Sequence, residues 1–167
     1  MIIRCTLKLL AELKIRPTQE ETVSDPFWSW HAKIFHIGRR KCVLITNDTT
    51  LFTIFIPGLK KPDFASFELV IGQHLFKNLI RENIPQRQIE SVLSECENMK
   101  FQKTDNRSVL GSMNDQKLQL EYLIFAEGGL ARTDIYELNQ NLNRNILSAI
   151  SYKHPIKMLK QKLKEIT

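Results

Sequence analysis

Hydrophobic and polar residues alternate most clearly between Phe27 and Pro57. In the first part of this stretch the apolar positions are Trp28, Trp30, Ala32 and Ile34, with polar residues between them. Residues 42–45 and 51–56 are continuous runs of apolar, β-branched or aromatic side chains. Both patterns are typical of strands, and the polar breaks at 38–41 and 47–50 contain the Gly, Asn and Asp that favour turns. The stretch therefore predicts an antiparallel meander of three strands, with one face packed and the other partly solvated.

Helical periodicity dominates the rest of the chain. Residues 2–5 predict a short strand and Thr6 a helix N-cap, whereas residues 15–25 predict a polar surface loop. From residue 63 onward, apolar residues recur at three- and four-residue steps, as they do on one face of a helix. The predicted helices are 6–14, 63–82, 86–98, 107–127, 135–142 and 155–166, with a short edge strand at 101–104. Asn139 to Asn145 form an Asn-rich segment in which the fifth helix ends.

These elements predict an α+β fold, in which an antiparallel β-meander of about three to five strands is covered by a layer of C-terminal helices. A length of 167 residues fits one domain that builds its own core. We therefore predict a single domain over residues 1–167. Residues 1–60 are mainly strands with one helix, and residues 63–167 are mainly helical.

The chain is basic, with a formal net charge of +6, and much of the surplus is at its end. Residues 151–167 contain five lysines and one glutamate. A basic surface favours an anionic partner such as nucleic acid, although a lysine-rich last helix accounts for much of the charge by itself. The candidate nucleic-acid contacts are Arg39, Arg40 and Lys41 at a predicted hairpin tip and Lys157, Lys160 and Lys164 on the last helix. Trp28 and Trp30 lie one strand before that tip, but alternate tryptophans on a strand more often pack in a core than stack on bases.

The cysteine content and the N-terminus indicate a cytoplasmic protein. Cys5, Cys42 and Cys96 are odd in number and far apart, which argues against a disulfide framework. There is no secretory signal and no apolar run near 18 residues, so we predict no membrane partner. The oligomeric state cannot be predicted from these features.

The sequence contains no established catalytic or nucleotide-binding motif, and we predict no metal and no cofactor. His31 and His36 are five residues apart on one predicted strand, so they point to opposite faces and cannot share a metal. The candidate polar site is Asn47, Asp48, Arg107, Ser108, Asn114 and Asp115. Gly111 lies in this second segment, at a cost of about 1 kcal/mol relative to Ala in a helix. A close helix crossing or a ligand site would each explain it.

Four segments together resemble a family of bacterial proteins that share a domain of unknown function. They are Trp30-x-Ala32, Arg39-Arg40-Lys41-Cys-x-Leu-x-Thr46-Asn47-Asp48, Pro57-Gly-Leu-Lys-Lys-Pro62 and Asn106-Arg-Ser-Val-Leu-Gly-Ser-Met-Asn-Asp115. The resemblance covers residues 3 to 159. It implies no activity and no catalytic residue.

Two functional hypotheses follow from the sequence. The first is a non-enzymatic binding or regulatory module that acts on nucleic acid or on a partner protein through basic and aromatic surface. The second is a small hydrolase or nuclease whose polar site contains Asp48, Arg107, Asn114 and Asp115. Convergence of these side chains with Asn47 in one concave pocket would favour an enzyme or ligand site.

Overall fold

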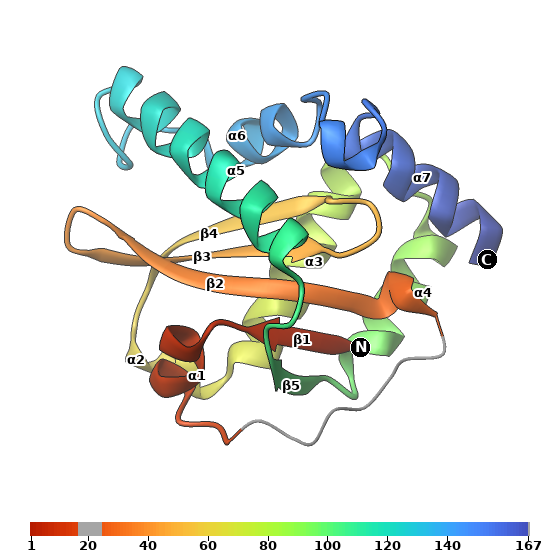
Figure 1. The fold of residues 1–167 in the computed structure, drawn as a ribbon, viewed down its shortest axis with the longest axis horizontal. Coiled ribbons are helices and arrows are strands. Elements are labelled where there is room, and N and C mark those ends of the chain that lie inside the picture. Colours follow the sequence, from red (N-terminus) through yellow and green to blue (C-terminus); the bar gives the residue numbers. More distant parts are fainter. Residues whose placement is uncertain (17–24, 167) are drawn as a thin grey trace.

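The computed structural model describes residues 1–16 and 25–166 and contains one five-stranded sheet with helices on both faces (Figure 1). The strands are β1 (Ile2–Cys5), β2 (Ser29–Ile37), β3 (Arg40–Asn47), β4 (Thr53–Leu59) and β5 (Lys100–Lys103). The helices are α1 (Leu7–Leu13), α2 (Lys61–Ala65), α3 (Phe67–Arg81), α4 (Gln86–Cys96), α5 (Arg107–Ala126), α6 (Ile135–Leu142) and α7 (Pro155–Ile166). Two short 3₁₀ turns are η1 (Pro26–Trp28) and η2 (Ser148–Ile150). The predicted loop at 15–25 lies largely outside the described residues.

The sheet is mixed, with the strand order β4-β3-β2-β1-β5. β2, β3 and β4 form the predicted antiparallel meander, which is confirmed. β1 pairs in parallel with β2 on one side and with β5 on the other, so the prediction of a purely antiparallel sheet is wrong. The reason lies in the connections, because β1 and β2 are separated by a long stretch of chain that contains α1, and a parallel pair needs such a long crossover instead of a short hairpin turn.

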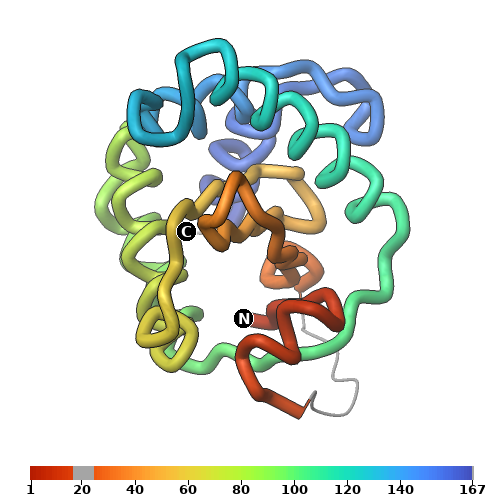
Figure 2. Tube along the Cα trace, turned by 90° about the vertical axis from the view of Figure 1, so that its left-hand side faces the viewer, coloured from red at the N-terminus to blue at the C-terminus, as the bar shows by residue number. Residues whose placement is uncertain are grey.

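Helices cover both faces of the sheet, whereas the sequence predicted one packed and one partly solvated face. One core cluster contains apolar residues of α1, α2, α3, α4 and α7. A second cluster, on the opposite face, contains residues of α5 and α6. Figure 2, which looks at the sheet from one end, shows α3 and α4 on one side and α5 on the other. The continuous apolar runs of β3 and β4 agree with this arrangement, since strands buried on both faces lose the alternation of half-exposed strands.

The two tryptophans lie in different elements. Trp30 is on β2 and is only 1% exposed. Trp28 is in η1 instead of on the strand and is half-buried, so its predicted position on a core strand is wrong. Pro26 favours a first helical turn, and the Asp25 carboxylate accepts a hydrogen bond from Phe27 N at 2.8 Å, so a turn precedes the strand.

Most of the predicted helices are present at close to their predicted bounds. The predicted start of α5 at Arg107 is confirmed, with the Asn106 side chain accepting hydrogen bonds from Ser108 N and Val109 N. The single helix predicted for 63–82 is instead divided into α2 and α3 at Ser66. In the part of the chain that the structure describes, no helix is both long and apolar enough to cross a membrane.

Two side chains of the Asn-rich segment form hydrogen bonds to the backbone of β4, a role that the composition of the segment did not indicate. β4 is an edge strand, and α6 lies along it. Asn143 Oδ1 accepts from Thr53 N at 2.7 Å, and its Nδ2 donates to Thr53 O at 2.7 Å. Asn139 makes the equivalent pair with Phe55 N at 2.8 Å and Phe55 O at 3.3 Å. Two side-chain amides one helical turn apart therefore occupy the hydrogen-bonding groups of the sheet edge.

Candidate functional site

A row of buried polar side chains crosses the sheet beneath α5. The strand register pairs Arg4 with Gln102 and with His31, His31 with Thr46, and Thr46 with Thr53. His31, Thr46 and Thr53 are fully buried. The Thr46 and Thr53 hydroxyls lie 2.8 Å apart, and Thr53 Oγ1 donates to Gln116 Oε1 of α5 at 2.9 Å. The sheet face under α5 is thus polar along one line in an otherwise apolar core.

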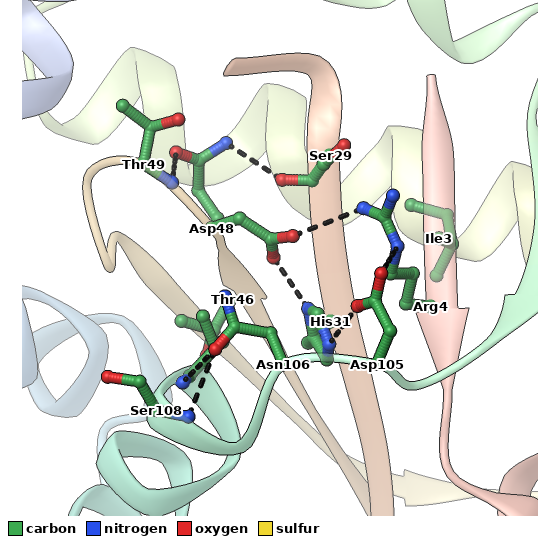
Figure 3. A network of polar contacts seen from close by, with 12 residues as sticks. Ile3, Arg4, Ser29, His31, Thr46, Asp48, Thr49, Asp105, Asn106 and Ser108 are labelled. Atoms are coloured by element: carbon green, nitrogen blue, oxygen red, sulfur yellow. Dashed lines mark hydrogen bonds and ion pairs between the residues drawn. The ribbon is translucent and has the colours of Figure 1, made fainter. Parts of the chain in front are cut away.

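At the β1–β2 end of this row, four charged or titratable side chains interlock (Figure 3). His31 Nδ1 lies 2.6 Å from Asp48 Oδ1, and its Nε2 lies 3.5 Å from Asp105 Oδ1. Arg4 contacts the same two carboxylates, with Nη1 3.3 Å from Asp48 Oδ2 and Nε 3.0 Å from Asp105 Oδ2. Arg4 and His31 thus each contact both carboxylates, and the four side chains form a closed ring of polar contacts. We call these four residues the charged ring.

The position of Asp48 depends on the turn between β3 and β4. Asn47 is fully buried, and its Oδ1 accepts from Thr50 N at 2.9 Å while its Nδ2 donates to Phe27 O at 2.7 Å. Asp48 N donates to Ser29 O at 3.0 Å, which ties the turn to the start of β2. An Asn side chain that bonds the backbone two or three residues ahead is a standard way to hold a turn. Asn47 therefore directs Asp48 toward the sheet without facing the site itself.

The β3–β4 turn forms one side of the site, and the segment that joins β5 to α5 forms the other side. Asp105 has a side chain that is 54% exposed and reaches back to Arg4. The next residues begin α5, a helix of 20 residues whose N-terminus faces the same space. Arg107 is exposed, and among the residues that the structure describes its guanidinium has no hydrogen bond or ion pair. It is therefore a charge available to a ligand.

These walls enclose an open pocket of about 760 Å³. It is lined by Arg4, Pro26, Ser29, Asp48, Thr49, Asp105, Asn106, Arg107 and Ser108. The lining combines two carboxylates, two guanidinium groups and three hydroxyls. It can therefore both donate hydrogen bonds to a polar ligand and accept them from it.

The charged ring is unsuited to hold a metal. Arg4 occupies the space between Asp48 and Asp105 that a cation would need. Within residues 1–16 and 25–166, no group of three or more His, Cys, Asp and Glu side chains is arranged to hold a metal ion. His31 Nδ1 lies within hydrogen-bond distance of Asp48, so Nε2 is the atom that would exchange a proton with a ligand if Asp105 moved aside.

Thiol chemistry is also disfavoured. Burial raises the pKa of Cys5 to about 12 and that of Cys96 to about 12. Burial likewise raises the pKa of Cys42. The thiolate is the nucleophilic form, so these cysteines stay protonated and inert at neutral pH.

The structure brings some of the predicted site residues together and separates others. Asp48, Arg107 and Ser108 line the pocket. Asn47 lies directly beneath it as the turn residue described above. Asn114 and Asp115 lie about two turns along α5 and do not line the pocket; Asn114 accepts a hydrogen bond from Lys33, whose pKa is lowered by burial and by Lys117.

Gly111 does not mark a helix crossing. It is exposed, and a Cβ at this position would meet no heavy atom within 4 Å. A close helix crossing, the first of the two explanations given for Gly111 from the sequence, is therefore wrong. Nor does Gly111 line the pocket, so no ligand contact explains it.

Sequence reasoning missed Arg4, His31 and Asp105. Arg4 interrupts an apolar strand and His31 stands between two buried strand positions, so each was a charged or titratable group that needed a partner. That signal was visible in the sequence. The identity of the partner was not visible, because Asp48 lies 44 residues from Arg4 and 17 residues from His31 along the chain.

The candidate nucleic-acid contacts fall into two separate groups (Figure 1). Arg39, Arg40 and Lys41 lie at the hairpin between β2 and β3. Lys157, Lys160 and Lys164 lie on α7, which Figure 1 shows at the opposite end of the molecule from this hairpin. The six side chains do not form one surface.

Comparison with known proteins gives one match. Residues 2–158 match a family model described as "Domain of unknown function (DUF6933)". The search of curated proteins and the search of solved structures each found no match. The resemblance to a family defined by a domain of unknown function is therefore confirmed, and the description of that family names no activity.

Proposed function

We propose that this chain, which belongs to the DUF6933 family, is a non-enzymatic binding module that takes the anionic group of a small polar ligand into the pocket beside Arg107. The observation that carries this proposal is the exposed Arg107 guanidinium, which has no partner among the described residues and lies at the rim of that pocket. Nucleotides and the phosphate ends of nucleic acids have the required chemistry.

The charges of the pocket support an anionic ligand. Asp48 and Asp105 are already paired with Arg4, and both also contact His31. Among the charged residues that line the pocket, Arg107 is the one whose side chain has no ion pair within the described residues. It stands at the first position of α5, where the helix dipole favours a negative group.

The size and polarity of the pocket define the ligand further. A volume of about 760 Å³ lies within the range of small-molecule sites, roughly 300–1,000 Å³. Ser29, Thr49 and Ser108 contribute hydroxyls, and Asp48 and Asp105 retain acceptor lone pairs. A ligand with a phosphate at one end and hydroxyl or amino donors at the other would match this lining, as a nucleoside monophosphate does.

Replacing Arg107 tests this proposal. We expect Arg107→Gln to weaken the binding of a nucleoside 5′-monophosphate about tenfold or more, since a hydrogen bond to a charged group contributes about 1.5–3 kcal/mol. The melting temperature should stay unchanged because the side chain is exposed and unpaired in the protein. Isothermal titration calorimetry with the four ribonucleoside monophosphates, and with inorganic phosphate, gives the affinities.

Arg87→Gln is the matched control, because Arg87 is an exposed arginine on α4, outside the pocket. It should bind as the unchanged protein does. Equal loss of affinity in both variants would show general charge attraction and would refute the pocket. No heat of binding with any of the five probes at millimolar concentration would refute it as well.

A second candidate function, a small hydrolase, is favoured by the contact of 2.6 Å between His31 and Asp48. An imidazole held by a carboxylate at one nitrogen can act as a general base at the other. Asp48 and Arg107 of the predicted hydrolytic set line the pocket, whereas Asn114 and Asp115 do not.

Hydrolysis of a chromogenic phosphodiester, bis(p-nitrophenyl) phosphate, distinguishes the two functions. If the second holds, Asp48→Asn should lower turnover by about 100-fold or more, because a misoriented general base loses its typical contribution of 10²–10⁴. Circular dichroism of the variant would show that it is folded. Release of p-nitrophenol at the uncatalysed rate by the unchanged protein would exclude this activity toward phosphodiesters.

A further inference from the structure

Five basic side chains meet at the end of the sheet that carries the β2–β3 hairpin. Arg39, Arg40 and Lys41 come from the hairpin, whereas Lys60 follows β4 and Lys61 is the first residue of α2. The register pairs Lys41 with Leu59, which places the two segments side by side. A hollow of about 480 Å³ is lined by these five cations together with Gly58 and Leu59. Figure 2 looks toward this end, with the hairpin in front.

We infer that this basic end binds the phosphodiester backbone of nucleic acid without reading its sequence. Arg39, Arg40, Lys60 and Lys61 are exposed, and none of their side chains has an ion pair within the described residues. Lys41 is different, since it pairs with Glu12 at 2.5 Å and lies over the Phe64 ring at 5.7 Å. Four of the five cations are therefore free to contact phosphates.

The local backbone holds these cations around the hollow. Gly38 and Gly58 have φ values of +57° and +70°, in the left-handed region that glycine adopts at low cost. Lys60 N donates to Asp63 Oδ2 at 2.6 Å, which fixes the start of α2 beside the hairpin. A hairpin and a helix start, both held by local hydrogen bonding, can present charges at a constant spacing to a regular polyanion.

The lining favours backbone contacts over base contacts. None of the residues around the hollow is aromatic, so there is no platform on which a base could stack. Lys and Arg contacts to phosphate position a protein on nucleic acid but carry no sequence information. The expected binding is thus electrostatic and independent of sequence.

This inference is independent of the ligand pocket. Ser29 at the start of β2 lines the pocket, whereas the hairpin follows Ile37 at the other end of the same strand. A negative binding result for one of the two sites therefore does not bear on the other site. Arg107→Gln should have no effect on binding at the basic end.

The test measures the salt dependence of binding to a fluorescein-labelled DNA duplex of 20 base pairs by fluorescence anisotropy. Four phosphate contacts predict that log K falls with log salt concentration with a slope of about −3.6. Removing two contacts in Arg39→Gln/Arg40→Gln should change the slope to about −1.8, and Lys60→Gln/Lys61→Gln should do the same. Two duplexes of unrelated sequence should bind within about twofold of each other, because phosphate contacts carry no base information.

Lys157→Gln/Lys160→Gln is the matched control, because it removes two lysines of α7 away from the hairpin. Its slope should equal that of the unchanged protein. The inference is overturned if the control loses as much as the hairpin variant, or if neither duplex is retained at about 50 mM salt, where such electrostatic binding is strong. The replaced side chains are exposed, apart from the partly buried Lys160, so the variants should fold as the unchanged protein does.

Discussion

Replacing Asn139 and Asn143 together by alanine should destabilise the protein by about 5 kcal/mol, the largest effect that we expect from two substitutions in this chain. Both side chains are 1% exposed, and each satisfies the N–H and the C=O of one residue of β4. Alanine would leave four backbone groups unpaired beneath α6. Each costs about 1–3 kcal/mol when it is buried without a partner. Since domains are stable by only about 5–15 kcal/mol, the double variant should be close to unfolding.

The two single variants separate the contributions. Asn143→Ala should cost about 3 kcal/mol, more than Asn139→Ala, because Asn143 makes the shorter bonds to β4 and also donates to Asn139 O at 2.9 Å. Urea denaturation gives the free energies of unfolding. Amide hydrogen exchange then locates the loss, since the amides of Thr53 and Phe55 should exchange far faster in the variants.

Asn141→Ala is the control for this prediction. Asn141 lies on the same helix and is exposed, so its replacement should leave stability unchanged or slightly higher, given the better helix propensity of alanine. A Thr53 amide that remains equally protected in Asn143→Ala would mean that the edge of β4 is held in another way. Unprotected β edges also promote association, so the double variant should aggregate on heating.

Trp30→Ala should destabilise the protein by about 3–5 kcal/mol, which is the usual cost of truncating a large buried aromatic side chain. Trp30 is 1% exposed and stands in the centre of the sheet, between Ile3 of β1 and Asn47 of β3. For a domain of this size, such a loss lowers the melting temperature by about 10 °C or more. Differential scanning calorimetry measures it directly.

Two further variants make this prediction specific. The Trp30 indole Nε1 is buried and has no hydrogen-bond partner, so Trp30→Phe removes an unpaired donor and should cost only about 1–2 kcal/mol. Trp28→Ala should cost less than Trp30→Ala, because Trp28 is half-buried and packs edge-to-face on Phe27. A melting temperature that is unchanged in Trp30→Ala, with a native circular dichroism spectrum, would contradict the central role of this side chain.

The amino-acid sequence determined the elements themselves. The alternation from Phe27 to Pro57 identified the meander, and the helical spacing placed the starts of α5 and α6 near Arg107 and Ile135. In the structure, the Asn106 and Asp134 side chains cap these two helices by accepting hydrogen bonds from the first turn. These features depend on neighbours within a few residues. Spacing and capping therefore predict them without knowledge of the rest of the fold.

Half of the candidate site could be predicted in the same local way. Asp48 follows a turn-forming Asn, and Arg107 and Ser108 begin a predicted helix, so each was recognisable as a polar group at the end of an element. Arg4 and His31 were visible only as polar residues on buried strands. Nothing local indicated that they contact the same two carboxylates.

The tertiary structure alone decided the direction and register of β1 and β5. β1 pairs in parallel with both β2 and β5, and its register with β2 aligns Arg4 with His31. A shift of one residue would turn Arg4 to the opposite face of the sheet, away from Asp48 and Asp105. The choice is made by the packing of helices on both faces and by hydrogen bonds between residues far apart in the chain, such as those from Asn139 and Asn143 to β4. Because these contacts join segments up to 90 residues apart, no window of sequence contains the information that fixes them.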